Sequence, residues 1–117
     1  MVLVAVDDLL FSSKIRTVAK QAGVEITFAR TPEEILRNSR ELKPALVVFD
    51  LNSAKADPIG TVASMKSDPA LAGIRTVGFV SHVDAATIGA ARRAGVDEVM
   101  PRSKFAGNLA DILQGRF

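Results

Sequence analysis

The chain has 117 residues, of which 48% are hydrophobic and 24% are charged, and this balance is typical of one globular domain spanning residues 1–117. With no cysteine and one histidine, the sequence excludes a disulfide framework and any metal site rich in cysteine or histidine. The net charge of +2 includes no basic block, so neither nucleic-acid nor membrane binding is indicated. No targeting segment precedes the first apolar run, and a cytoplasmic location is expected.

Five apolar runs predict five β-strands. The first, third and fourth runs carry apolar residues on both faces, as strands buried in the middle of a sheet do. The second run alternates polar and apolar residues, and the fifth leads into Pro101, a residue tolerated mainly at sheet edges. The five runs cover residues 2–6, 25–29, 45–49, 74–80 and 96–100.

Segments with helical periodicity follow these strands. The first helix is expected to end at Gly23, and Thr31 with Glu34 three residues later predicts a capped start for the second. The third helix is expected over 59–66 and the fourth over 84–95, between a capping aspartate and a glycine. The apolar positions assigned to the first and last helices are Leu10, Ile15, Val18, Ala19, Ala22, Leu109, Ile112 and Leu113.

Strands that alternate with helices predict a parallel sheet with helices on both faces. The three buried strands belong in the centre of the sheet, and the second and fifth belong at its edges. The predicted strand order is therefore 2-1-3-4-5, which is the flavodoxin-like, doubly wound α/β fold.

In such a sheet a ligand binds beyond the carboxyl ends of the strands, where the winding reverses, here between the first and third strands. Asp7 and Asp8 follow the first strand, and Asp50 ends the third. Adjacent strands lie about 4.8 Å apart, so three carboxylates are expected to share one mouth. A hard divalent cation would offset their repulsion, and Mg²⁺ suits such oxygen ligands.

Two further groups follow neighbouring strands, the hydroxyl of Ser81 and the guanidinium of Arg102. A carboxylate surrounded by a cation, a hydroxyl and a guanidinium is suited to accept a phosphoryl group, here on Asp50. Each residue also has a structural interpretation. Asp7 or Asp8 could cap a helix, Asp50 could open a turn, and the other two could be surface groups.

In their order and spacing, these residues resemble the receiver domain of bacterial two-component response regulators, over nearly the whole chain. The resemblance implies that Asp7 and Asp8 help to hold Mg²⁺, that Asp50 is the phosphoacceptor, and that Asn52 lends a backbone carbonyl to the metal. Ser81 matches the hydroxyl that ends the family's fourth strand. The segments SDPALAGIRTVGFVS and AARRAGVDEVMPRS are also similar to the family's sequences around the fourth helix.

The chain departs from the family pattern at several positions. Arg102 stands where the family has a lysine followed by proline, with Lys104 two residues further on, and a guanidinium fork differs in geometry from a compact ammonium. Val99 takes the place of an aromatic residue that couples to the hydroxyl in the family. The other departures are Ala54 and Pro58 in the loop after the acceptor and His82 beside the pocket.

The resemblance implies a phosphorelay protein that takes a phosphoryl group from a sensor histidine kinase or phosphotransfer protein onto Asp50. It would signal to a downstream protein target, without being an enzyme beyond its own phosphorylation and dephosphorylation. The contact surface would be the fourth helix, fifth strand and last helix, at about 84–113, which could also join two copies of the chain.

Two other functions stay open. The departures from the family pattern favour a pseudo-receiver, a module that binds proteins independently of phosphorylation. A flavin-binding protein or small-molecule enzyme on the same fold has less support, because the segment DDLLFSS after the first strand contains no glycine-rich phosphate loop.

Overall fold

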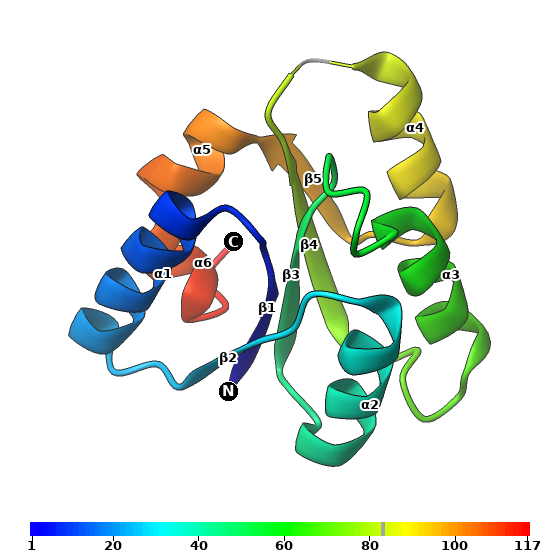
Figure 1. Ribbon diagram of the computed structural model, residues 1–117, viewed down its shortest axis with the longest axis horizontal. Helices are drawn as coiled ribbons and strands as arrows, with labels where there is room; N and C mark the ends of the chain where they lie inside the picture. Colours follow the sequence, from blue (N-terminus) through cyan, green and yellow to red (C-terminus); the bar gives the residue numbers. More distant parts are fainter. Residues whose placement is uncertain (83) are drawn as a thin grey trace.

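The computed structural model describes residues 1–82 and 84–117. Strands and helices alternate along the chain up to β5, which two short helices follow (Figure 1). In the described part of the chain, no helix is both long and apolar enough to cross a membrane. The elements are β1 (Val2–Ala5), α1 (Leu9–Ala22), β2 (Ile26–Phe28), α2 (Pro32–Leu42), β3 (Leu46–Asp50), α3 (Pro58–Ser67), β4 (Arg75–Val80), α4 (Ala85–Ala94), β5 (Glu98–Pro101), α5 (Arg102–Gly107) and α6 (Leu109–Leu113).

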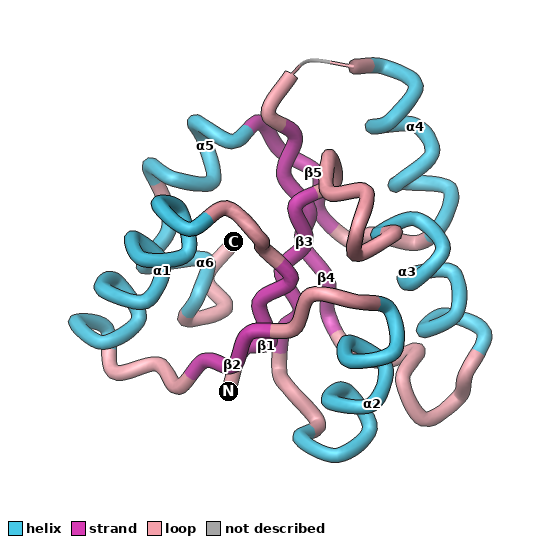
Figure 2. The backbone as a smooth tube through the Cα atoms, viewed as in Figure 1, coloured by secondary structure: helices cyan, strands magenta, loops and turns pink. Residues whose placement is uncertain are grey.

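The five strands form one parallel sheet in the order β2-β1-β3-β4-β5, which confirms the predicted topology (Figure 2). In the register of the sheet, Val2 of β1 lies opposite Ile26 of β2 and Leu46 of β3. All of β1 is buried, whereas β2 at the edge is half-buried throughout. The apolar runs form the central strands, where helices cover both faces of the sheet and bury their side chains.

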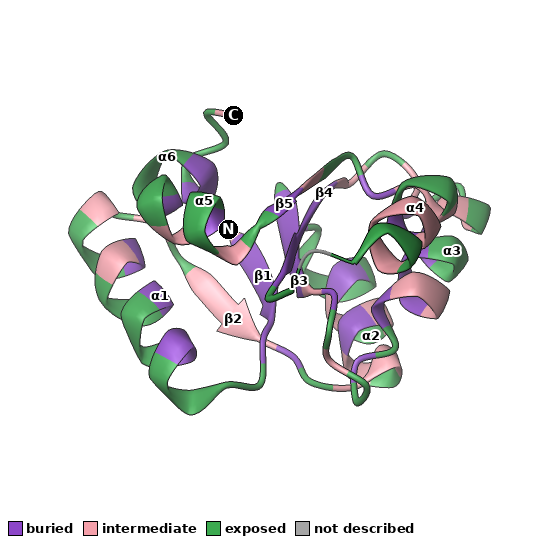
Figure 3. Cartoon of the chain, turned by 90° about the horizontal axis from the view of Figure 1, so that it is seen from above, coloured by how far each residue is buried: buried purple, intermediate pink, exposed green. Residues whose placement is uncertain are grey.

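Helices form a layer on each side of the sheet (Figure 3). Alternate residues of a strand point to opposite faces, so Val2 and Val4 pack with α1, α5 and α6, whereas Leu3 and Ala5 pack with α2, α3 and α4. Two apolar clusters result, one on each face of the sheet. They hold the strands rigidly and leave the carboxyl ends of the strands as a common edge.

Most helix ends lie where local sequence signals predicted them. The backbone N–H of Glu34 donates to the Thr31 hydroxyl at 3.2 Å, which confirms the cap of α2. Gly23 and Gly95 end α1 and α4 in the left-handed conformation, with φ of 71° and 109°. Asp84 caps α4 through two backbone N–H groups. These ends are determined by capping and by glycine's freedom at positive φ.

Two expectations were wrong, and one helix was missed. Leu10 is 86% exposed, and Phe11 takes the buried position at the start of α1. The helix α5 (Arg102–Gly107) was not predicted. The last strand begins at Glu98 rather than at residue 96, because the Val96 N–H donates to a carbonyl at the end of α4 and completes that helix end.

Candidate functional site

The carboxyl ends of four strands bring the predicted site residues to one edge of the sheet. Asp7 and Asp8 follow β1, Asp50 ends β3, Ser81 follows β4 and Arg102 follows β5. Because β1 and β3 are neighbours at the point where the winding reverses, this edge is where a doubly wound sheet binds its ligands. We call the part of this edge around Asp8, Asp50 and Arg102 the acidic mouth.

Asp50 lies half-buried at the end of a buried strand. One carboxylate oxygen, Oδ1, accepts a hydrogen bond from the backbone N–H of Asn52 at 3.0 Å. Among residues 1–82 and 84–117, no second hydrogen bond to this carboxylate is found. Burial raises the pKa of Asp50, and the Asn52 hydrogen bond and the charge of Arg102 oppose that rise. The nearby Asp8 charge adds to it, so the two acids act on each other.

Asp8 caps α1 and also forms an ion pair. Its Oδ1 accepts the backbone N–H of Phe11 at 3.0 Å, and its Oδ2 lies 3.2 Å from an Nη2 of Arg102. The Phe11 hydrogen bond first, and the Arg102 hydrogen bond second, lower the pKa of Asp8. The cap interpretation and the site interpretation are therefore compatible for this residue.

Arg102 is held by an aromatic ring as well as by a carboxylate. Its guanidinium carbon lies 4.2 Å from the centre of the Phe11 ring. That ring packs edge-on against Phe79 and Phe105, with centres 5.3 Å and 5.8 Å away. The other candidate for the family's lysine position, Lys104, instead lines a cleft formed by β5, α5 and α6. Arg102 is therefore the cation at the acidic mouth.

Asp7 does not share the acidic mouth with the other two acids. Its carboxylate lies 3.5 Å from Nε of Arg30, which follows β2. Consecutive residues in extended backbone point to opposite sides, and Asp8 has extended backbone angles. Within the described ranges, no three acidic or histidine side chains lie close enough to hold an ion together. The expected crowding of three carboxylates is therefore wrong, and Asp8 and Asp50 form the acidic pair.

The side chain of Asn52 links two loops at the acidic mouth, which sequence reasoning missed. Its Oδ1 accepts the backbone N–H of Ser81 at 2.7 Å. Ser81 itself is exposed, as is His82 beside it. The strand register explains this contact: Asp50 lies opposite Phe79, which places the residues two further on side by side. The turn after β3 and the loop after β4 are thereby joined.

The oxygen donors of the acidic mouth fit a divalent cation. The carboxylates of Asp8 and Asp50 and the backbone carbonyl of Asn52 are the hard ligands that Mg²⁺ prefers. Arg102 engages Asp8 in the structure, with Nη2 lying 3.2 Å from Oδ2. The two side chains of this ion pair are 36% and 39% exposed, which means that water and salt screen their attraction. Displacement of the guanidinium is therefore feasible.

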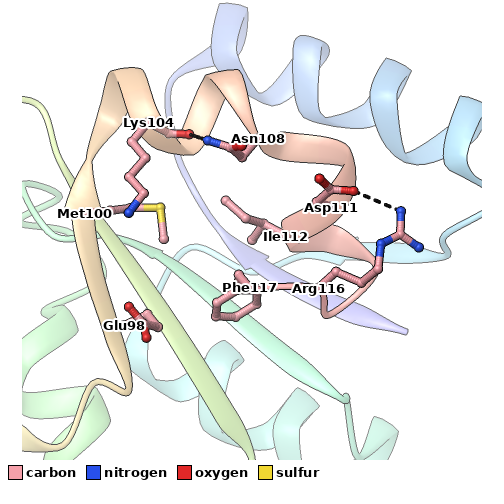
Figure 4. Close-up of a pocket in the computed structure, with 8 residues that line it drawn as sticks. All are labelled: Glu98, Met100, Lys104, Asn108, Asp111, Ile112, Arg116 and Phe117. Atoms are coloured by element: carbon pink, nitrogen blue, oxygen red, sulfur yellow. Dashed lines mark hydrogen bonds and ion pairs between the residues drawn. The ribbon is translucent and has the colours of Figure 1, made fainter.

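A cleft of about 300 Å³ lies away from the acidic mouth, on the surface formed by β5, α5 and α6 (Figure 4). Met100, Ile112 and Phe117 supply apolar side chains, with Lys104 and Glu98 at its edges. The cleft overlaps the surface that the sequence predicts for partner contacts, and Arg116 and Phe117 extend it beyond residue 113.

A shallower groove of about 370 Å³ adjoins the acidic mouth between the turn after β3 and α4. Asn52, Asp57 and Thr87 are among the residues that line it. The acidic mouth itself is a polar surface site, which suits a small charged group better than an apolar ligand.

No protein-family model and no curated protein sequence matches this chain. Solved structures do match it. The response regulator from Hahella chejuensis has a TM-score of 0.87 and 19% identity, covering 99% of this chain and 93% of that one. The phosphorylated cyanobacterial phytochrome response regulator RcpA has a TM-score of 0.78 and 22% identity, covering 97% and 88%. The Mn²⁺-bound response regulator Rcp1 has a TM-score of 0.77 and 21% identity, with the same coverages. The chain therefore has the fold of response-regulator receiver domains.

Proposed function

We propose that this protein is a receiver domain of phosphorelay signal transduction, in which Asp50 accepts a phosphoryl group from the phosphohistidine of a kinase or phosphotransfer protein. A carboxylate oxygen attacks phosphorus, the bond from phosphorus to the imidazole nitrogen breaks, and the histidine leaves. The observation that carries the proposal is the position and orientation of the Asp50 carboxylate, at the point of a receiver fold where the winding of the sheet reverses. One oxygen is oriented by the Asn52 N–H, and the carboxylate stands at the end of a buried strand.

The neighbouring residues would position the incoming group. Arg102 and the Ser81 hydroxyl would donate hydrogen bonds to phosphoryl oxygens. Asp8, Asp50 and the backbone carbonyl of Asn52 would hold Mg²⁺, which offsets the negative charge of the phosphoryl group. Asp7 would join them only by leaving Arg30. The domain would work in the cytoplasm as a phosphoacceptor rather than as an enzyme.

The output would pass through a protein surface. The region from α4 to α6 contains the cleft of Figure 4, where a downstream target or a second copy of the chain would bind. Val99 on β5 replaces the aromatic residue that the family resemblance implies, and it is half-buried. We therefore expect only small changes at this surface on phosphorylation, or coupling through another element.

Treatment with acetyl phosphate and Mg²⁺, followed by intact-mass measurement, tests the proposal. The wild type should gain one phosphoryl group, and Asp50→Asn should gain none. Asp57→Asn is the matched control, because it removes an exposed carboxylate from the same loop while asparagine keeps both the helix cap and the tolerance for a φ of 39°. Equal modification of the wild type and Asp50→Asn would refute the assignment of Asp50.

A pseudo-receiver is the second candidate, and a specific observation favours it. Arg102 neutralises Asp8 and Arg30 neutralises Asp7, so both acids have a partner without any metal ion. In this case the wild type would stay unmodified by acetyl phosphate, and Asp50→Asn would bind the same protein partners as the wild type.

A further inference from the structure

We propose that Arg102 is a built-in counter-ion of the acidic mouth, and that a divalent cation binds there only by displacing its guanidinium from Asp8. This inference rests on the proposed function, because it concerns how that site takes up its metal ion. It makes Arg102 a competitor of the ion before phosphorylation, in addition to a donor to the phosphoryl group.

Two contacts hold the guanidinium where the ion would bind. Nη2 lies 3.2 Å from Oδ2 of Asp8, and the guanidinium carbon lies 4.2 Å from the centre of the Phe11 ring. Phe11 is 6% exposed, and its contacts with Phe79 and Phe105 fix the ring. A planar guanidinium can stack on a ring and present its N–H groups to a carboxylate at the same time, which an ammonium cannot do as well.

The hydrogen bonds of Asp8 leave an ion no separate oxygen. Oδ1 accepts the N–H of Phe11, and this bond is part of the helix cap of α1. Oδ2 accepts from Arg102. An ion that left the cap intact would therefore approach Oδ2, where the guanidinium lies.

Charge balance leads to the same conclusion. The carboxylates of Asp8 and Asp50 carry two negative charges, and Arg102 carries one positive charge. A divalent ion added beside the guanidinium would leave an excess positive charge, whereas an ion that replaced the guanidinium would balance the pair. The charge of Arg102 acts on both acids, so its departure changes the environment of the phosphoacceptor as well.

A titration with Mg²⁺ tests this competition. The chain has no tryptophan or tyrosine to report binding by fluorescence, so backbone amide shifts of the ¹⁵N-labelled full chain provide the readout. Arg102→Gln removes the charge and keeps a polar side chain, and we expect the Kd for Mg²⁺ to fall about tenfold. Arg102→Lys keeps the charge but loses the stacking, and its Kd should fall by less.

Arg40→Gln is the matched control. It removes one guanidinium from another exposed ion pair, with Asp68 at 3.3 Å, and changes the net charge equally. Its Kd should stay within about twofold of the wild type, because salt screens charges that lie far from the site. A gain in affinity for Mg²⁺ that is confined to the Arg102 variants supports the competition. This holds even if the wild type shows no Mg²⁺ binding and only the Arg102 variants bind the ion.

Two results would overturn the inference. One of them leaves the proposed metal site intact, and the other also removes that site from the proposed function. If Arg102→Gln and the wild type bind Mg²⁺ equally, or if the variant binds more weakly, Arg102 does not compete and the metal site stands. If neither protein binds Mg²⁺ at tens of millimolar, the competition fails together with the metal site in the proposed function.

Discussion

The carboxylate of Asp50 is partly buried, although it lies at the surface edge where the strands end. Burial is the largest cause of its raised pKa, so the folded state favours the protonated form more than the unfolded state does. A raised pKa in the folded state means that this residue's contribution to stability is complete below the unfolded pKa. The contribution is then lost as the pH rises through the folded pKa. At neutral pH the ionised Asp50 therefore destabilises the fold.

We predict that Asp50→Asn is more stable than the wild type at pH 7 in metal-free buffer. The gain should be about 0.5 kcal/mol, a size that allows for the partial exposure of the side chain. It should shrink as the pH falls toward 3.8, the ordinary pKa of aspartate, because the wild-type carboxyl then becomes neutral. Urea unfolding followed by circular dichroism at several pH values measures both effects. A variant less stable than the wild type at pH 7 would contradict the burial argument.

At the scale of elements, the contact between β4 and the turn after β3 positions the acidic mouth. Leu51 lies between Asp50 and Asn52 and is 5% exposed. A Cβ at Gly78 of β4 would lie 2.7 Å from the side chain of Leu51. Glycine at this position lets Leu51 pack directly on the backbone of β4, so the position of Asp50 depends on a residue outside the site.

We predict that Gly78→Ala lowers the free energy of unfolding by about 1–3 kcal/mol, because an overpacked Leu51 must move. The amide signals of Asn52 and Ser81 should shift with it, since the two loops are hydrogen-bonded to each other. Gly73→Ala is the control, because its Cβ would meet no described atom within 4 Å. Unfolding in urea and amide shift maps check both variants. Unchanged stability and unchanged amide signals in Gly78→Ala would show that Leu51 is not a support.

Elements that depend on local pattern and burial could be predicted from sequence. β1, β3 and β4 were found because they carry apolar residues on both faces, and α2 because Thr31 caps it. The helix α5 could not be found this way. It has six residues and Pro101 before it, with no side-chain cap in the described part of the chain, and Phe105 packs into the aromatic cluster instead.

Side-chain directions at the acidic mouth show the same division. Strand ends placed Asp8 and Asp50 near each other, because the sheet order determines which ends are neighbours. The sequence could not show that Asp7 faces Arg30, since that choice depends on a partner from another loop. The network around Arg102 likewise joins α1 to α5, at positions 94 residues apart.

At the scale of the whole molecule, residues 115–117 are held by contacts with Arg75, at the opposite end of β4 from the acidic mouth. Arg75 begins β4, and its Nη1 donates to the carbonyl of Gly115 at 3.0 Å. Its guanidinium carbon lies 3.7 Å from the centre of the Phe117 ring, and Nη2 donates to the Phe117 carbonyl. Ser81 follows the other end of this strand. The Arg75 contacts and the acidic mouth are therefore separated by the length of β4.

We predict that Arg75→Ala loosens residues 115–117 and lowers the free energy of unfolding by about 1–2 kcal/mol, through the loss of two hydrogen bonds and one cation–π contact. Hydrogen exchange should accelerate near the end of α6, and Arg75→Lys should show a smaller effect. The Kd for Mg²⁺ should stay at the wild-type value. A changed Kd would show that the two ends of β4 are coupled.

The seat of Arg102 on the Phe11 ring has a spectroscopic consequence. Protons above the face of a phenyl group are shielded by its ring current, so the side-chain signals of this arginine lie upfield while the stack persists. If the guanidinium leaves the ring, these signals return to ordinary frequencies. The chemical shift of the Arg102 side chain therefore reports the fraction of molecules in which the guanidinium has left Phe11. The protein thus carries its own label for the proposed exchange of Arg102 with a metal ion.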